Sequence, residues 1–229
     1  MISNRKTAII VGVLFIIGTV AGVLTLPFAG SLDDPDYLTN VSANETQVII
    51  GALLALIMGC LVIIPVMMFP IFKKYNEALA LGYIVFRVLE VVTYIVVVIS
   101  WLLLLTLSKE YVKAAVPDDS YFQTFGTLLR AAGDWNSAIM TIVFCLGALI
   151  LYYLLYQSKL IPRFISVWGL IGATLHLAEG LLGMFGLISR FSTISIFLFL
   201  PIAVNEMFLA VWLIVKGFNP SAIASESAK

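Results

Sequence analysis

The sequence contains little charge and few of the side chains that usually hold metals. Asp, Glu, Lys and Arg make up 11% of the 229 residues, and their formal charges cancel to zero. Lys and Arg form no basic patch of the kind that follows the phosphates of a nucleic acid, so no nucleic-acid partner is expected. The chain has a single histidine, which excludes a zinc site built from three histidines and a haem held by two.

The chain also has few candidates for redox or nucleophilic chemistry. Its two cysteines, Cys60 and Cys145, lie in apolar stretches and have no CxxC partner. We therefore interpret both as buried thiols and expect no redox motif. No GxSxG motif is present, and neither cysteine lies near the histidine in the sequence, so candidates for a catalytic nucleophile are few.

Apolar residues, in contrast, dominate the composition. They make up 62% of the chain, and the mean hydropathy is +1.08. A soluble domain is about half apolar and about one quarter charged, and a single core of this size could not bury such an excess. Lipid is the solvent that suits this composition, and helices satisfy their own backbone hydrogen bonds in lipid. The sequence therefore predicts an all-α, polytopic integral membrane protein that forms one bundle over residues 1–229.

Six stretches are long enough to cross a membrane, which requires about 20 apolar residues per helix. The first stretch is longer than the apolar region of a signal peptide, so we expect it to be retained as a helix. The predicted spans cover residues 8–29, 48–72, 78–106, 135–156, 164–188 and 194–215.

The Lys and Arg residues near the ends of these spans are divided unequally between the two sides of the membrane. Eight lie on one side, namely Arg5, Lys6, Lys73, Lys74, Lys159, Arg163, Lys216 and Lys229, and four lie on the other, namely Lys109, Lys113, Arg130 and Arg190. Cytoplasmic loops are enriched in positive charge, so the first side is predicted to be cytoplasmic. Both termini then lie in the cytoplasm, and the protein is expected to be a multi-pass protein of the cytoplasmic membrane.

The tryptophans agree with these spans. Trp101 and Trp135 fall at predicted outer ends, and Trp168 and Trp212 lie towards predicted inner ends. Trp prefers the membrane–water interface, where its ring can lie in lipid while its N–H stays near water. No tryptophan falls at a predicted midplane, which supports the assignment of the spans.

The predicted outer loop between the third and fourth spans contains an amphipathic pattern. Apolar residues recur at helical spacing from Tyr121 to Ala132, after a start signal at Pro117. We therefore expect an amphipathic helix on the outer leaflet, either as a lid over the bundle or as a plain connector. Asp134 is expected to be the N-cap of the fourth span.

Four charged residues, the single histidine and Asn205 fall inside the predicted spans, where the membrane interior should exclude charge. They are Arg87 and Glu90 in the third span, His176 and Glu179 in the fifth, and Asn205 and Glu206 in the sixth. A charge at the bilayer centre costs about 2.5–3.5 kcal/mol, so these side chains should face the bundle interior. A rise of about 1.5 Å per residue places the ionisable ones within about 10 Å of one another in depth. We therefore predict one buried polar site that binds or passes a small ligand, an ion or a proton.

The charges of this predicted site do not balance. If all three glutamates are ionised and His176 is neutral, three negative charges face the single positive charge of Arg87. Such an excess of negative charge is not plausible in hydrocarbon. Either one or two glutamates are protonated, or His176 is protonated and paired with Glu179, or a cation is bound. A metal site of His176, Glu179 and Glu206, with Glu90 as a base, is one form of the last alternative. The identity of any cofactor is left open.

Two other functions stay open at this point. The chain is either an intramembrane enzyme, with or without a metal, that acts on a lipid-like substrate, or a structural or sensory subunit. In the structural case Arg87 pairs with the glutamates, fixes the register of the helices and binds nothing. Glycines surround the polar pair of the fifth span and should let neighbouring helices approach closely. They are Gly169, Gly172, Gly180, Gly183 and Gly186.

Several short motifs along the chain are typical of one family. They are Arg5-Lys6-Thr7-Ala8 before the first span, Phe86-Arg87-Val88-Leu89-Glu90 in the third, Ile161-Pro162-Arg163-Phe164 before the fifth, and Pro201, Glu206 and Lys216-Gly217-Phe218 near the end. With these motifs the chain resembles a six-helix bacterial membrane-protein family catalogued as domain-of-unknown-function family 4386. The resemblance implies a bacterial or archaeal cytoplasmic-membrane protein. It implies no reaction and assigns no functional residues.

Overall fold

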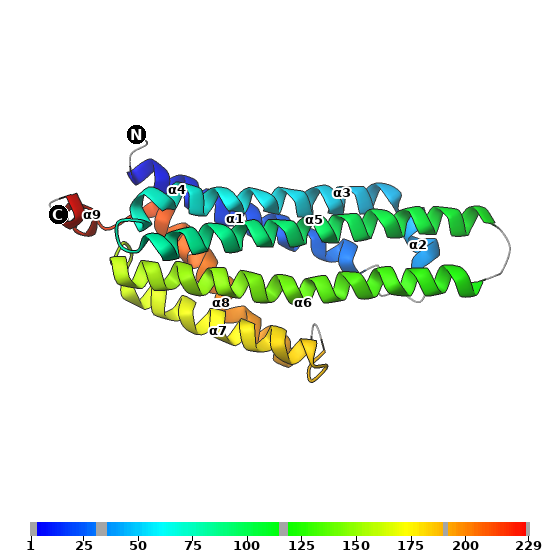
Figure 1. Cartoon of the computed structure of the whole chain (residues 1–229). Helices are drawn as coiled ribbons and strands as arrows, with labels where there is room; N and C mark the ends of the chain where they lie inside the picture. The colour runs from blue at the N-terminus through cyan, green and yellow to red at the C-terminus, as the bar shows by residue number, and fades with distance from the viewer. Residues whose placement is uncertain (1–3, 31–35, 115–118, 190–191, 228–229) are drawn as a thin grey trace. The chain divides into compact units, whose positions relative to one another are not determined.

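A computed structural model of the chain describes residues 4–30, 36–114, 119–189 and 192–227. Three residues used in the sequence predictions, Pro117, Arg190 and Lys229, lie outside these ranges. Within the described residues all regular elements are helical, which confirms the all-α prediction. In chain order (Figure 1) they are α1 (Asn4–Gly30), α2 (Tyr37–Ala43), α3 (Glu45–Met58), the 3-10 helix η2 (Gly59–Val62), α4 (Ile63–Phe72), α5 (Glu77–Ala114), α6 (Asp119–Ser158), α7 (Arg163–Met184), α8 (Thr193–Val215) and α9 (Pro220–Ser227).

Among the described residues, six helical stretches are long and apolar enough to cross a membrane, which confirms the predicted number of spans. They are Asn4–Phe28, Glu45–Phe72, Glu77–Ala114, Tyr121–Ser158, Arg163–Met184 and Thr193–Val215. Many large apolar side chains on these stretches are exposed, and Val85, Ile171 and Phe197 are each more than half exposed. Such surfaces are compatible with lipid rather than with water. The chain is therefore a multi-pass membrane protein.

The second span is not one continuous α-helix, because η2 separates α3 from α4. Pro65 lies in the first turn of α4. It has no N–H to donate to the carbonyl of Leu61, and its ring would clash with that carbonyl in a regular α-helix. The tighter turn at Gly59–Val62 is the local adjustment to this proline. Pro201 lies inside α8 and does not interrupt it.

Helices α5 and α6 are longer than a bilayer requires. They contain 38 and 40 residues, which corresponds to lengths of about 57 and 60 Å, whereas the hydrocarbon core measures about 30 Å. The segment from Tyr121 to Ala132 is the first part of α6 and runs without a break into the fourth span. The prediction that Asp134 caps a separate helix is therefore wrong, because no proline or turn interrupts residues 119–158. The position of this segment at the outer leaflet stays a prediction.

Backbone contacts divide the chain into two compact units. Unit 1 comprises the described residues of Met1–Ile17, Cys60–Glu90 and Ala138–Lys229, and unit 2 comprises those of Gly18–Gly59 and Val91–Ser137. Each unit has its own buried apolar cluster. In unit 1 this cluster includes Ile64, Met68, Leu154, Leu155 and Ile165, which are almost completely buried. All six polar residues predicted from the sequence belong to unit 1.

Unit 2 is held together by apolar packing around α2 and by polar contacts at its edges. Its largest cluster consists of Tyr37, Leu38, Val41, Val48, Leu104 and Leu105. The guanidinium of Arg130 in α6 lies 4.7 Å from the ring centroid of Tyr37 in α2. Lys109 in α5 forms an ion pair with Glu45 in α3. These contacts fix α2 and the first turn of α3 to the parts of α5 and α6 that belong to this unit.

Within unit 1, α7 and α8 pack closely against each other. A Cβ atom on Gly172 of α7 would lie 2.8 Å from the backbone nitrogen of Ile202 in α8, so a side chain does not fit there. A Cβ atom on Gly180 would lie 2.6 Å from a side chain of α6. No atom lies within 4 Å of such a Cβ at Gly183 or Gly186 among the described residues. Close packing is therefore confirmed at Gly172 and Gly180, and it does not extend to the last two glycines.

Candidate functional site

Arg87 of α5 is almost completely buried, with 2% of its surface exposed. Glu90 lies three residues further along the same helix, a spacing that places both side chains on one face. The Nη1 atom of Arg87 lies 3.0 Å from Oε1 and 3.1 Å from Oε2 of Glu90, and donates to both. Hydrogen bonds between opposite charges are shorter and stronger than neutral ones. Glu90 is therefore the principal carboxylate partner of Arg87.

Glu206 of α8 brings a second carboxylate to the same guanidinium. Its Oε1 atom lies 3.9 Å from Nη2 of Arg87, within ion-pair range but too far for a hydrogen bond. Among the described residues, none donates a hydrogen bond to Oε1 of Glu206. The side chain of Glu206 is 14% exposed. Arg87, Glu90 and Glu206 form what we call the Arg87 group, which links α5 to α8.

Aromatic rings surround the guanidinium of Arg87. Its Cζ atom lies 6.0 Å from the ring centroid of Phe15 in α1, 5.7 Å from that of Tyr83 in α5 and 5.6 Å from that of Phe144 in α6. Cation–π attraction operates at such distances and is stronger where water is excluded. Together with Glu206, these rings place Arg87 at the meeting point of α1, α5, α6 and α8. Of these three rings, only that of Tyr83 could be placed near Arg87 from the sequence, because Tyr83 lies four residues before Arg87 on the same helix.

Tyr152 extends this interior on the side of α6. Its side chain is fully buried, and its ring packs against Gly169 of α7, where a Cβ atom would come within 2.3 Å of it. Within the described part of the chain, the Tyr152 hydroxyl has no hydrogen-bond partner. Tyr152 therefore places a buried phenol at the contact between α6 and α7.

His176 and Glu179 form a second polar group, together with Ser195 of α8. The Nδ1 atom of His176 lies 3.1 Å from Oε2 of Glu179, and the hydroxyl of Ser195 donates a hydrogen bond to Oε1 of Glu179. The imidazole ring packs edge-on against Phe144 of α6, at 5.9 Å between centroids, and against Phe199 of α8, at 4.9 Å. We call these three residues the His176 group.

Phe144 lies between the two groups, because its ring contacts both Arg87 and His176. The residues predicted as one polar site thus lie in two neighbouring groups on either side of one aromatic ring. The idea that the two groups act as a single site stays a prediction.

Asn205 has a contact of a different kind. Its side chain is fully buried, and its Nδ2 atom donates a hydrogen bond of 3.1 Å to the backbone carbonyl of Ile165. Asn205 therefore ties α8 to the first turn of α7. A buried amide that joins two helices in this way is a common form of polar contact in membranes.

Residues 10–217 match the family model described as Domain of unknown function (DUF4386). The chain belongs to this family. The matched region contains both polar groups and confirms the resemblance found in the sequence motifs. Neither the curated proteins nor the solved structures yield a match. The description of the DUF4386 family names no activity, so the function is argued from the geometry of the chain.

The geometry of the two groups bears on the metal and enzyme hypotheses. In the described ranges, no three His, Cys, Asp or Glu side chains gather closely enough to hold a metal ion. The predicted metal set of His176, Glu179 and Glu206 is divided between the two groups, and it would require these side chains to move.

In a serine hydrolase the histidine lies between serine and carboxylate. Here Ser195 donates directly to Glu179, and a carboxylate in the middle does not reproduce that arrangement.

Proposed function

We propose that the chain is a membrane protein that binds and passes a proton, and that Glu206 is the group that carries it. The observation behind this proposal is that two carboxylates, Glu90 and Glu206, share one guanidinium in an interior lined by aromatic rings. If both carboxylates were ionised, the Arg87 group would have a net negative charge. An unbalanced buried charge is very unfavourable. A bound proton removes this imbalance.

The geometry supports Glu206, rather than Glu90, as the carrier. Glu90 accepts two hydrogen bonds from Arg87, at 3.0 and 3.1 Å, which stabilise its ionised form. Glu206 lies at 3.9 Å and lacks a hydrogen bond to Arg87. Its side chain is also more exposed than that of Glu90, 14% compared with 3%. Because Arg87 stabilises the ionised form of Glu206 less than that of Glu90, Glu206 is the carboxylate that binds a proton more readily.

The His176 group supplies the next step of the proposed route. A histidine gains or loses a proton close to physiological pH more readily than any other unperturbed side chain. His176 contacts Phe144, which in turn contacts Arg87. Movement of the Phe144 ring would open a path between the two groups. We place this protein in the cytoplasmic membrane with both termini in the cytoplasm, on the basis of the unequal distribution of Lys and Arg.

Proton flux into liposomes tests this function. The purified protein is reconstituted with a pH-sensitive dye inside the vesicles, and a potassium gradient with valinomycin imposes a membrane potential. We expect the wild type to admit protons and Glu206→Gln to admit them no faster than empty vesicles. A glutamine preserves the shape of the side chain but cannot exchange a proton at this position.

Glu77→Gln is the matched control, because Glu77 is an exposed glutamate in the first turn of α5. This variant should retain the flux of the wild type. The unfolding temperature of Glu206→Gln should stay close to that of the wild type, since a neutral side chain replaces a protonated one. Equal flux in the wild type and in Glu206→Gln would contradict the proposal.

A further inference from the structure

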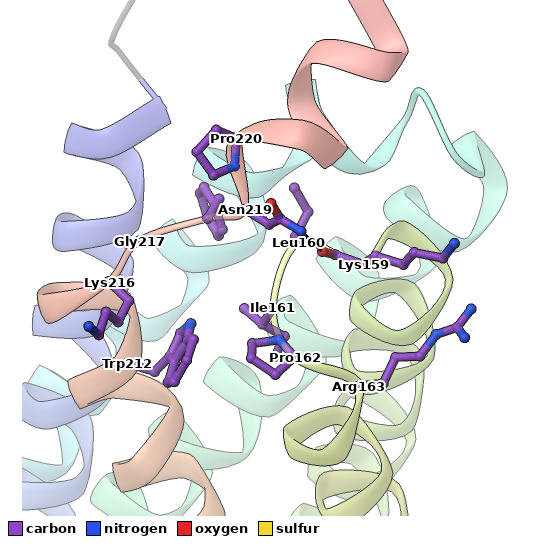
Figure 2. Close-up of a pocket in the computed structure, with 11 residues that line it drawn as sticks. Lys159, Leu160, Ile161, Pro162, Arg163, Trp212, Lys216, Gly217, Asn219 and Pro220 are labelled. Carbon is purple, nitrogen blue, oxygen red and sulfur yellow. Dashed lines mark hydrogen bonds between the residues drawn. The ribbon is translucent and has the colours of Figure 1, made fainter.

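A hollow of about 500 Å³ lies in unit 1, where α6 connects to α7 and α8 connects to α9. Figure 2 shows Trp212 and Pro162 on opposite walls, with Asn219 and Pro220 above them. Its volume is within the range of about 300–1,000 Å³ that is usual for small-molecule sites. None of its lining residues belongs to the Arg87 group or the His176 group. This is therefore a separate candidate site.

The rim of the hollow is positively charged. In Figure 2, Lys216 lies on one side, and Lys159 and Arg163 lie on the other. The lining residues that the structure describes include no Asp or Glu. As far as the structure describes the chain, none of these three cations has a carboxylate within ion-pair distance. Uncompensated positive charge around a hollow attracts an anion.

Local structure places the backbone of these residues beside the hollow, and in Figure 2 the charged ends of Lys159 and Arg163 point outward from it. Lys159 has a φ of 55°, the left-handed conformation that ends α6 and turns the chain towards α7. The guanidinium of Arg163 lies 4.9 Å from the ring centroid of Tyr156 in α6. At the end of α8, Arg5 donates hydrogen bonds to the carbonyls of Ile214 and Val215, at 2.8 and 3.2 Å. Arg5 thereby satisfies terminal carbonyls of α8 next to Lys216.

An aromatic strip leads from the hollow along α7 and α8. It consists of Phe164, Trp168, Phe208 and Trp212, and Trp212 also lines the hollow. The ring centroid of Phe208 lies 5.9 Å from those of Phe164 and Trp168 and 6.5 Å from that of Trp212. Phe164 is 56% exposed and Phe208 is 40% exposed. Because α7 and α8 are long and apolar enough to span a membrane, we expect the exposed rings of this strip to contact acyl chains.

We propose that this hollow binds the phosphate-bearing headgroup of an anionic phospholipid, with an acyl chain lying along the aromatic strip. Basic pockets between membrane helices at the membrane surface bind such headgroups. The hollow lies where α7 begins and α8 ends, and the ends of helices that span a membrane are expected at the depth of the headgroups. A free phosphate compound would use the cations but not the strip. The continuity of rim and strip through Trp212 therefore favours a lipid.

Native mass spectrometry of the detergent-purified protein tests this proposal. The probes are dioctanoyl phosphatidylglycerol and, as the neutral comparison, dioctanoyl phosphatidylcholine. We expect the wild type to retain the anionic lipid in preference to the neutral one. Arg163→Gln/Lys216→Gln should weaken retention about 25-fold, because each basic residue near the membrane surface contributes about five-fold to the binding of an anionic lipid.

Lys73→Gln/Lys74→Gln is the matched control. It removes the same charge from the connection between α4 and α5, and neither residue lines the hollow. This variant should bind the anionic lipid like the wild type, and the unfolding temperatures of both variants should show that they are folded. Equal losses in the two double variants would indicate diffuse attraction and would overturn the proposal. Full retention by Arg163→Gln/Lys216→Gln would also overturn it.

Phe208→Ala distinguishes a lipid from a free phosphate compound. We expect this variant to weaken the binding of phosphatidylglycerol several-fold, because it shortens the aromatic strip. Glycerol 1-phosphate and inorganic phosphate should compete for the site only at much higher concentration than the lipid. If either competes at the same concentration as the lipid, and Phe208→Ala has no effect, the ligand is a free phosphate compound and the lipid assignment is wrong.

Discussion

Arg87→Leu is expected to lower the free energy of unfolding by about 3–5 kcal/mol, because it leaves the buried carboxylate of Glu90 without its guanidinium. Arg87 is the cation that lies 3.0 Å from Glu90 and 3.9 Å from Glu206. Leucine fills part of the same space but replaces neither the hydrogen bonds nor the charge. Reversible unfolding of the purified protein in mixed micelles measures this loss.

Two further variants show whether the effect comes from charge. Arg87→Leu/Glu90→Leu should recover most of the lost stability, because it also removes the carboxylate that depends most on Arg87. Lys113→Leu is the control for replacing a cation by leucine, since its side chain is 70% exposed in an i,i+3 pair. Exposed pairs of this kind contribute about 0–1 kcal/mol. Equal stability of Arg87→Leu and Lys113→Leu would contradict the charge balance described for the Arg87 group.

Gly172→Ala should destabilise the packing of α7 on α8 by about 1–3 kcal/mol, the usual effect of placing an extra methyl group in a packed core. The new Cβ atom would lie 2.8 Å from a backbone nitrogen of α8, which cannot rotate away as a side chain can. Gly183→Ala is the matched control in the same helix, because nothing described lies within 4 Å of its Cβ. Alanine at this second position should be neutral or stabilising by up to about 1 kcal/mol.

The same substitution has a consequence for the polar groups. Separation of α7 from α8 would lengthen the hydrogen bond from Ser195 to Glu179 and the one from Asn205 to Ile165. Gly172→Ala should therefore lower proton flux as well as stability, whereas Gly183→Ala should change neither. An unfolding temperature of Gly172→Ala equal to that of Gly183→Ala would contradict the close packing of these helices.

The spans could be predicted from the sequence because a membrane imposes a local requirement, a sufficient length of apolar residues. The pairing of Arg87 with Glu90 also follows from local geometry, since residues three apart share one face of a helix. The same applies to His176 and Glu179. Contacts within one helix can therefore be inferred from spacing, and both pairs are present in the structure.

The surroundings of Arg87 could not be predicted in this way. Phe15 and Phe144 lie in spans that are apolar on all sides, so periodicity does not separate a residue that faces lipid from one that faces the interior. Asn205 is polar like its neighbour Glu206, yet its amide bonds a backbone carbonyl of α7. Its role depends on which helix lies opposite, which is a property of the tertiary packing.

The hollow and the extent of α6 also depend on more than local sequence. Lys159, Arg163 and Lys216 suggested the orientation of the chain, but their meeting around one hollow requires the helix ends to come together. In α6, the polar segment around Asp134 suggested a helix start. The structure continues the helix through it, because no residue there breaks the backbone hydrogen bonds.

Infrared spectroscopy of the purified protein tests most directly whether Glu206 carries a proton, because a protonated carboxyl group and a carboxylate absorb at different frequencies. We predict that the wild type shows the band of a protonated carboxyl group, that Glu206→Gln lacks it and that Glu179→Gln keeps it. A spectrum without this band in the wild type, or one that Glu206→Gln leaves unchanged, would contradict the assignment of the proton to Glu206.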